Sequence, residues 1–158
     1  MLQKYLLVFL VSMVPLIELR GAIPIATMGY GLDYWTSLVV CVIGNMLPVP
    51  VIYFFARKVL LWGCEKKYIG KFFTYCIEKG EKGGQKLTAR AGRGGLFIAL
   101  MLFVGIPVPG TGAWTGTLAA SFLNMGIKST SLAVSLGVVM AGIIMGVVSM
   151  TGIHVFGL

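Results

Sequence analysis

The chain has 158 residues, of which 58% are hydrophobic and only 11% are charged. A soluble globular domain carries about 25% charged residues. This deficit, with a mean hydropathy of +0.93 and long apolar runs, excludes an ordinary soluble fold and indicates an integral membrane protein. We expect one all-α membrane domain over residues 1–158, because a helix satisfies its own backbone hydrogen bonds in lipid.

Four apolar regions follow one another along the chain: Tyr5–Leu32, Trp35–Ala56, Leu96–Leu123 and Ser129–Phe156. The second would form about 33 Å of helix, enough to cross the ~30 Å hydrocarbon core, and the fourth is longer still. The first and third are interrupted, with breaks expected at Pro24 and at Pro107 and Pro109. Each arm beside a break would form only about 18 Å of helix.

Arms of this length are too short to cross the bilayer, so we interpret each interrupted region as a re-entrant helical hairpin that enters and leaves on one side. A single kinked span in each region is the alternative. The breaks lie at membrane depth in both cases, where non-helical backbone must be buried in protein or line a wet cavity.

Basic residues are concentrated between the two halves of the chain. Ten of the 13 Lys and Arg residues, but only three of the five acidic residues, lie in residues 57–93, which therefore carry +7 of the net charge of +8. Cytoplasmic loops of membrane proteins are rich in Lys and Arg, so this stretch is interpreted as a cytoplasmic linker. Apolar residues at helical spacing from Tyr68 to Cys76 predict an amphipathic helix on the lipid surface, ended by the glycines from Gly80 to Gly84.

The two halves repeat the same order of elements. A hairpin and a transmembrane helix in residues 1–56 are followed by the linker 57–93, and then by a second hairpin and helix in residues 94–158. With the linker inside, the two hairpins open on opposite sides, which makes an inverted repeat. Paired interrupted segments in such repeats are the best sequence indication of a transporter's substrate site.

Glu18 and Arg20 are charged residues inside the first hairpin. Even on the lenient insertion scale, a charged side chain at this depth costs about 2.5–3.5 kcal/mol, so the two residues need a structural or functional reason. They could form a mutual ion pair, or Glu18 could cap free backbone amides. The functional hypothesis makes Arg20 an anion-binding group and Glu18 a carrier of the coupling proton or ion.

The break of the second hairpin has no charged residue but an unusual backbone composition. A helix is expected to restart near Ala113, and its free amides would form an anion site inside the protein. The candidate substrate-binding residues, besides Arg20, are Gly110, Thr111, Gly112, Trp114 and Thr115. A tight turn that only lets two short helices pack is the alternative.

The sequence shows no catalytic triad, zinc motif, P-loop or metal cluster, so we expect no enzyme, no metal and no cofactor. In the last helix Ala133, Gly137 and Ala141 form a stripe of small residues, and Gly142 and Gly146 form a GxxxG pair. Both favour close helix contact, within one chain or in a homodimer.

The segments from Glu18 to Pro24 and from Phe103 to Gly116 closely resemble the family called putative small multidrug export proteins. This family is similar to the DedA superfamily of membrane transporters, which shares paired re-entrant hairpins. The resemblance implies a multi-pass protein of a bacterial or archaeal plasma membrane, coupled to protons or sodium ions. It also implies undecaprenyl phosphate, the lipid carrier of cell-wall synthesis, as a substrate.

Three functions remain open from the sequence. The first is translocation of an anionic lipid such as undecaprenyl phosphate, held by Arg20 and the hairpin amides. The second is export of small hydrophobic cations with Glu18 as the binding carboxylate, against which the charge of Arg20 argues. The third is a non-transporting membrane scaffold, in which Glu18 and Arg20 matter for folding alone. The expected partners are a membrane lipid or hydrophobic small molecule and the bilayer, and no nucleic acid.

Overall fold

The computed structural model describes residues 1–15, 17–66, 70–108 and 111–156, and every regular element in these ranges is helical. The prediction of an all-α fold is thus confirmed. In chain order the elements are α1 (Leu2–Met13), α2 (Glu18–Pro24), the π-helical turn η1 (Ile25–Gly29), α3 (Tyr34–Met46), α4 (Pro48–Cys64), α5 (Gly70–Gly105), α6 (Ala113–Phe122) and α7 (Ile127–Phe156).

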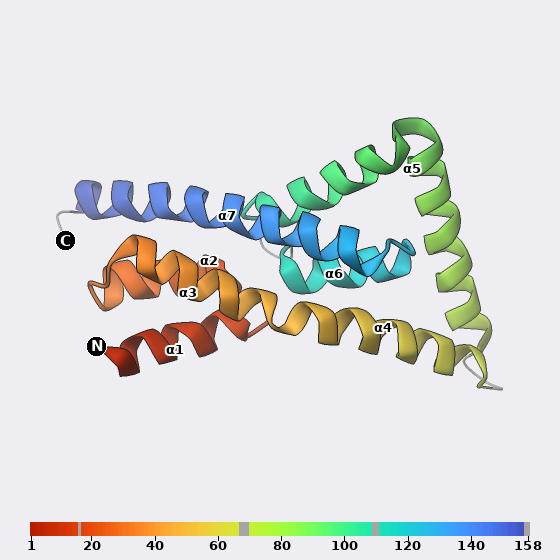
Figure 1. Cartoon of the computed structure of the whole chain (residues 1–158), viewed down its shortest axis with the longest axis horizontal. Helices are drawn as coiled ribbons and strands as arrows, with labels where there is room; N and C mark the ends of the chain where they lie inside the picture. The colour runs from red at the N-terminus through yellow and green to blue at the C-terminus, as the bar shows by residue number, and fades with distance from the viewer. Residues whose placement is uncertain (16, 67–69, 109–110, 157–158) are drawn as a thin grey trace.

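Two long helical runs form the frame of the molecule (Figure 1). Helices α3 and α4 follow end to end, and α7 lies beside them in the opposite direction. The combined helix Tyr34–Cys64 and the segment Ile127–Gly152 have the length and apolar composition to cross a membrane. The first run is longer than the span expected at Trp35–Ala56, because α4 continues through residues 57–64. Pro48 lies at the start of α4, where its missing N–H does not interrupt the helix.

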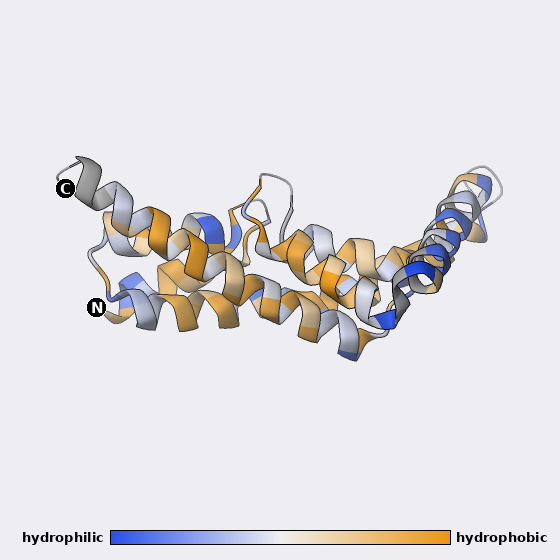
Figure 2. Ribbon diagram, turned by 90° about the horizontal axis from the view of Figure 1, so that it is seen from above, coloured by the Kyte–Doolittle hydropathy of each residue, from blue (hydrophilic) through white to orange (hydrophobic). Residues whose placement is uncertain are grey.

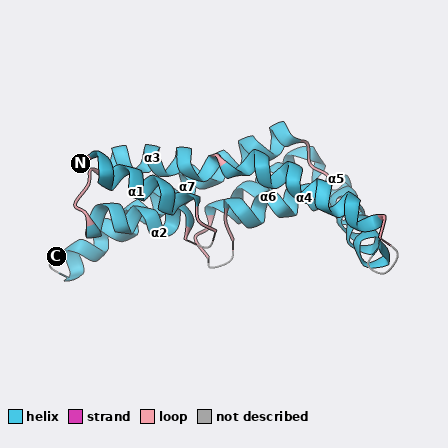
Figure 3. Cartoon of the chain, turned by 90° about the horizontal axis from the view of Figure 1, so that it is seen from below, coloured by secondary structure: helices cyan, strands magenta, loops and turns pink. Residues whose placement is uncertain are grey.

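The short helices fill the two ends of this frame. Helices α1 and α2 pack together at one end, and the second half of α5 packs with α6 at the other (Figures 1 and 3). The turns between the paired helices meet near the middle of the long axis. The first half of α5 crosses the far end and joins α4 to the second pair.

The break in the first pair lies earlier in the sequence than expected. The turn lies between the end of α1 at Met13 and the start of α2 at Glu18, and Pro24 lies in the last position of α2, directly before η1. Val14 has an extended backbone (φ −73°, ψ 129°), the conformation that a following proline favours, so Pro15 ends α1. Pro24 has no N–H to donate to the carbonyl oxygen of Arg20, and a π-helical turn follows it directly.

The linker also differs from the sequence prediction. Residues 57–64 belong to α4, and α5 continues past Gly80 and Gly84 to a kink at Gly92, which has φ +69°. The glycines do not end the helix; they let it approach the end of α6, because a Cβ at Gly84 would lie 2.7 Å from the carbonyl oxygen of Leu123. The expected start of the amphipathic helix at Tyr68 lies outside the described residues. Figure 2 shows that the first half of α5 is the most hydrophilic part of the chain.

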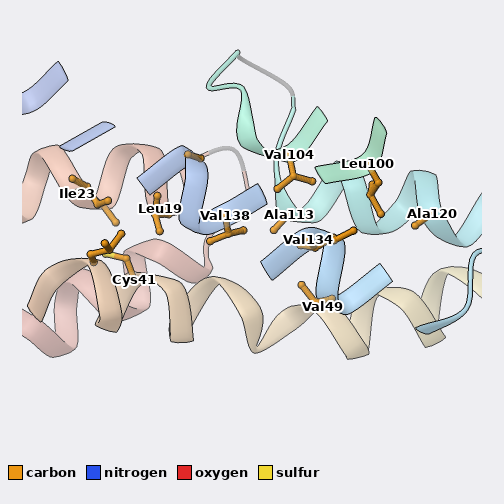
Figure 4. Packing of buried hydrophobic residues seen from close by; sticks show 14 of the residues in the cluster. Leu19, Ile23, Cys41, Val49, Leu100, Val104, Ala113, Ala120, Val134 and Val138 are labelled. Atoms are coloured by element: carbon orange, nitrogen blue, oxygen red, sulfur yellow. The ribbon is translucent and has the colours of Figure 1, made fainter. Parts of the chain in front are cut away.

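The core runs along the contact of the short helices with α7 (Figure 4). Leu19 and Ile23 of α2 are buried at one end, and Val104 of α5 is buried beside Val134 and Val138 of α7. The stripe of small residues on α7 packs against other helices of the same chain. A Cβ at its middle residue, Gly137, would lie 2.7 Å from the carbonyl oxygen of Met101, so the stripe allows α5 to pack closely on α7.

Candidate functional site

The two hairpin turns are joined by hydrogen bonds from residues of α1 and α2 to the turn between α5 and α6. We call this junction the tip contact, and define it by Glu18 and Arg20 on one side and residues 104–108 and 111–114 on the other. Within the tip contact, the indole N–H of Trp114 also donates to the carbonyl oxygen of Met13 over 3.2 Å. The tip contact connects residues far apart in sequence near the middle of the molecule (Figure 1).

Glu18 caps the first turn of α6. Its Oε2 accepts from the backbone N–H of Ala113 (3.2 Å) and its Oε1 accepts from the N–H of Trp114 (3.1 Å). The side chain is buried, with 6% of its surface exposed. The first N–H groups of a helix have no partner within the helix and carry its positive dipole end, so a carboxylate is the stabilising occupant.

The prediction that a helix restarts at Ala113 is therefore confirmed, and its amides do form an oxyanion site. The oxyanion in this conformation is the protein's own carboxylate. Glu18 stands where an external phosphate or carboxylate would bind. Two hydrogen bonds to a charged acceptor are each worth about 1.5–3 kcal/mol, which offsets a large part of the cost of placing this charge inside an apolar bundle.

Glu18 and Gly112 fix each other's conformation. Glu18 has φ +49°, an uncommon backbone conformation for a residue with a side chain. Gly112 has φ +158° and ψ −171°, a region open almost only to glycine. A Cβ at Gly112 would overlap the Glu18 carboxylate, lying 2.7 Å from its carboxyl carbon. The glycine is thus required both for the backbone turn and for the approach of the carboxylate.

Arg20 occupies the opposite end of the same turn. Its Nη2 donates to the carbonyl oxygens of Val104 (3.0 Å) and Ile106 (3.2 Å) and to the hydroxyl of Thr111 (2.9 Å), while Nη1 donates to the carbonyl oxygen of Val108. Carbonyl groups at the end of a helix lack partners and carry its negative dipole end. The planar guanidinium supplies several donors at fixed angles, so it can satisfy a group of carbonyls that a lysine could not.

The two charges of α2 thus bind the two helix ends of the second hairpin. The anion lies on the N-terminus of α6, and the cation lies on the carbonyls at and beyond the C-terminus of α5. The only ion pair among the described residues joins Glu78 and Lys82. The expected alternative of a mutual Glu18–Arg20 ion pair is therefore wrong, and the alternative in which Glu18 caps backbone amides is correct.

The other predicted site residues have distinct places. Thr111 accepts from Arg20, and Thr115 bonds locally to the carbonyl oxygen of Gly112 over 3.4 Å. Pro107 lies in the turn between α5 and α6. Pro109 and Gly110 lie outside the described residues. Pro24 lies at the end of α2, away from the turn that joins α1 to α2.

Sequence analysis missed the backbone partners of the site. The carbonyl groups of Val104, Ile106 and Val108 carry no sequence signal, because every residue has one. Pro15 did carry a signal for the first turn, since proline at this position ends a helix. Among the residues that the structure describes, no three His, Cys, Asp or Glu side chains gather closely enough to hold a metal ion.

The long apolar helices, with the buried Glu18 and the half-buried Arg20 at helix ends between them, define a helical membrane protein. Residues 18–144 match the family described as "Putative small multi-drug export protein", and the chain belongs to this family. The match begins at Glu18 and covers the whole tip contact up to the middle of α7. No curated protein and no solved structure matches the chain.

Proposed function

We propose that this protein is a membrane transporter in which the tip contact forms the barrier to the substrate. The two helical pairs would be re-entrant hairpins of an inverted repeat, opening on opposite sides of the plasma membrane, with residues 57–93 in the cytoplasm. The proposal is supported by the arrangement of the pairs, which start from opposite ends of the molecule and meet in its middle (Figure 3). It is also supported by the name of the family.

The observation that carries the proposal is the Glu18 carboxylate on the amides of Ala113 and Trp114. When ionised, Glu18 holds the two turns together. When it takes up a proton, the charge that faces the helix dipole is lost and both hydrogen bonds weaken. The turns then separate, and the amides of α6 become free for another oxyanion. Transport would therefore be coupled to protons through Glu18.

The favoured substrate is an anionic lipid such as undecaprenyl phosphate, as in the DedA-like transporters that the sequence resembles. A phosphate oxygen would replace the Glu18 carboxylate on α6, and Arg20 would exchange carbonyl groups for phosphate oxygens. Arginine is suited to this exchange because its parallel N–H groups match a phosphate as well as they match a set of carbonyls. The lipid tail would remain in the bilayer beside the exposed apolar residues Ile106 and Val108.

Export of hydrophobic cations is a second candidate, consistent with the family's name. One observation favours it: the Arg20 guanidinium is directed to backbone carbonyls, so it neutralises Glu18 less than their closeness in sequence suggests. A protonated amine could then bind Glu18 beside the Trp114 ring. No chemical conversion is part of either candidate.

The test is translocation of a fluorescent polyprenyl phosphate in liposomes containing the purified protein. A quencher added outside reports how much labelled lipid reaches the outer leaflet with time. We expect translocation that depends on pH in the wild type and loses this dependence in Glu18→Gln. Glu65→Gln, at an exposed acid after α4, is the matched control and should behave as the wild type.

Unchanged pH dependence in Glu18→Gln would disprove the coupling role. Transport of ethidium but not of the labelled lipid would select the cation exporter. If neither moves, while Glu18→Gln still lowers the melting temperature, the tip contact serves folding alone and the protein is a scaffold.

A further inference from the structure

A cavity of about 850 Å³ lies between the crossing half of α5 and the turn that joins α6 to α7. Gln85 and Arg93 line it from α5, Leu123 and Asn124 line it from the turn, and Lys128 lines it from α7. Its volume is in the range of small-molecule sites in proteins. It is separate from the tip contact, because Leu96 at its wall is eight residues, or about 12 Å of helix, from Val104.

The backbone of α5 explains why the cavity exists. Gly80 and Gly84 bring α5 into contact with the backbone at the end of α6. The kink at Gly92 then turns the chain away from the crossing direction, as the bend of α5 in Figure 1 shows. A wedge therefore opens between the two halves of α5 and the turn at Leu123.

The cavity is cationic and has free donors. Arg93 and Lys128 are exposed, and neither forms an ion pair or a hydrogen bond with another residue that the structure describes. Glu81 also lines the cavity, which leaves the two cations in excess of one acid. Gln85 and Asn124 add neutral amide donors, so the lining suits an anion with several oxygens.

The two cations also lie where apolar helices begin. Arg93 follows the kink at Gly92, the first residue of the apolar segment Gly92–Gly105, and Lys128 is the second residue of the candidate span Ile127–Gly152. Figure 2 shows the hydrophobic bundle meeting the hydrophilic crossing segment in this region. Leu96 and Leu123 form an apolar wall beside the charges. A site at this boundary presents cations at headgroup level and apolar surface at acyl-chain level.

We propose that this cavity binds a phosphate group between Arg93 and Lys128, carried by an anionic membrane lipid or by a soluble phosphate ester. The bound phosphate bridges α5 and α7. It thereby fastens the second half of α5 to the start of α7, next to the kink at Gly92. The site does not depend on the tip contact, so it stands or falls separately from the proposed transport.

The test is a binding titration of the full-length protein in mild detergent, followed by native mass spectrometry. The probes are phosphatidylglycerol, phosphatidylcholine as the lipid without net charge, and glycerol 3-phosphate as the soluble ester. A cation near a membrane surface contributes about fivefold in affinity for an anionic lipid. We expect Arg93→Gln and Lys128→Gln each to weaken phosphatidylglycerol binding about fivefold, and the double variant about 25-fold. Lys86→Gln, an exposed lysine of α5 outside the cavity, should leave it unchanged.

Preference for phosphatidylglycerol over glycerol 3-phosphate would identify the lipid as the source of the phosphate, and the reverse would identify the soluble ester. Equal binding of both phospholipids, or equal weakening by Lys86→Gln, would overturn the proposal. A second measurement needs no variant. Hydrogen exchange in residues 123–129 of the wild type should slow with the preferred phosphate probe and not with phosphatidylcholine, and unchanged exchange would also overturn the site.

Discussion

Gly112→Ala tests the geometry of the tip contact most directly. The new Cβ would lie 2.7 Å from the carboxyl carbon of Glu18 and 2.8 Å from its Oε1, closer than unbonded atoms approach. Glu18 cannot retreat and keep its bonds to α6. We therefore expect the substitution to separate the turns or to displace the carboxylate from both amides.

The expected cost has two parts. Forcing alanine into the backbone conformation of Gly112 costs about 1–3 kcal/mol. Displacing the carboxylate weakens two hydrogen bonds to a charged group, each worth about 1.5–3 kcal/mol, although partial rearrangement recovers some of this energy. We expect Gly112→Ala to lower the free energy of unfolding by about 3–5 kcal/mol. In a Glu18→Ala background only the backbone part remains, so the coupling between the two sites should be about 2 kcal/mol.

The assay is reversible unfolding in mixed micelles of dodecyl maltoside and sodium dodecyl sulfate, followed by circular dichroism. Two glycines serve as controls. Gly31 has φ +60° but open space around it, so Gly31→Ala should cost only about 1 kcal/mol of backbone strain. Gly126 also has open space and no positive φ, so Gly126→Ala should be within ~0.5 kcal/mol of the wild type. An equal cost of Gly112→Ala with and without the Glu18 carboxylate would refute this geometry.

Three further predictions concern other contacts. Arg20→Lys should lower the free energy of unfolding by about 2 kcal/mol, since a single ammonium cannot satisfy the carbonyls that the guanidinium bonds. A loss under ~0.5 kcal/mol would argue against the hydrogen bonds from Arg20 to these carbonyls. Trp114→Phe should cost about 1 kcal/mol in the same assay, because it removes the indole bond to Met13 while keeping most of the ring. Hydrogen bonds from Thr36 hold the pKa of Asp33 below its ordinary value of 3.8, so the carboxylate stabilises the start of α3 above that pH and loses this effect as pH falls through its lower folded pKa. Hydrogen exchange at the start of α3 should therefore speed up in this acid range in the wild type but not in Asp33→Asn.

The sequence was sufficient to predict the elements whose signals are local. The apolar run after Trp35 and the run before Phe156 are long and unbroken, and both form the long helices of the frame. The restart of a helix at Ala113 was predictable because a glycine-rich turn precedes it. The same kind of signal misled at Gly80 to Gly84, where the glycines serve packing against α6 and the helix continues.

The first turn shows that local sequence signals do not indicate which of two prolines ends a helix. Pro15 and Pro24 both disfavour a continuous helix, but the break was predicted at Pro24 alone. In the structure, α1 ends before Pro15, whereas Pro24 is the last residue of α2 and is followed by a π-helical turn. The partners of Glu18 and Arg20 were beyond sequence reasoning, because backbone amides and carbonyls 84 to 96 residues away satisfy them.

That separation has a consequence for how the protein is made. A ribosome completes α1 and α2 long before it reaches Val104 and Trp114, so the first hairpin waits with Glu18 and Arg20 lacking the groups that satisfy them. In a bilayer such charges are held near the surface, where water can solvate them. In the proposed re-entrant arrangement, the N-terminal hairpin would therefore reach its final depth only after the second hairpin is made, and a chain released before residue 104 should lack a stable first half.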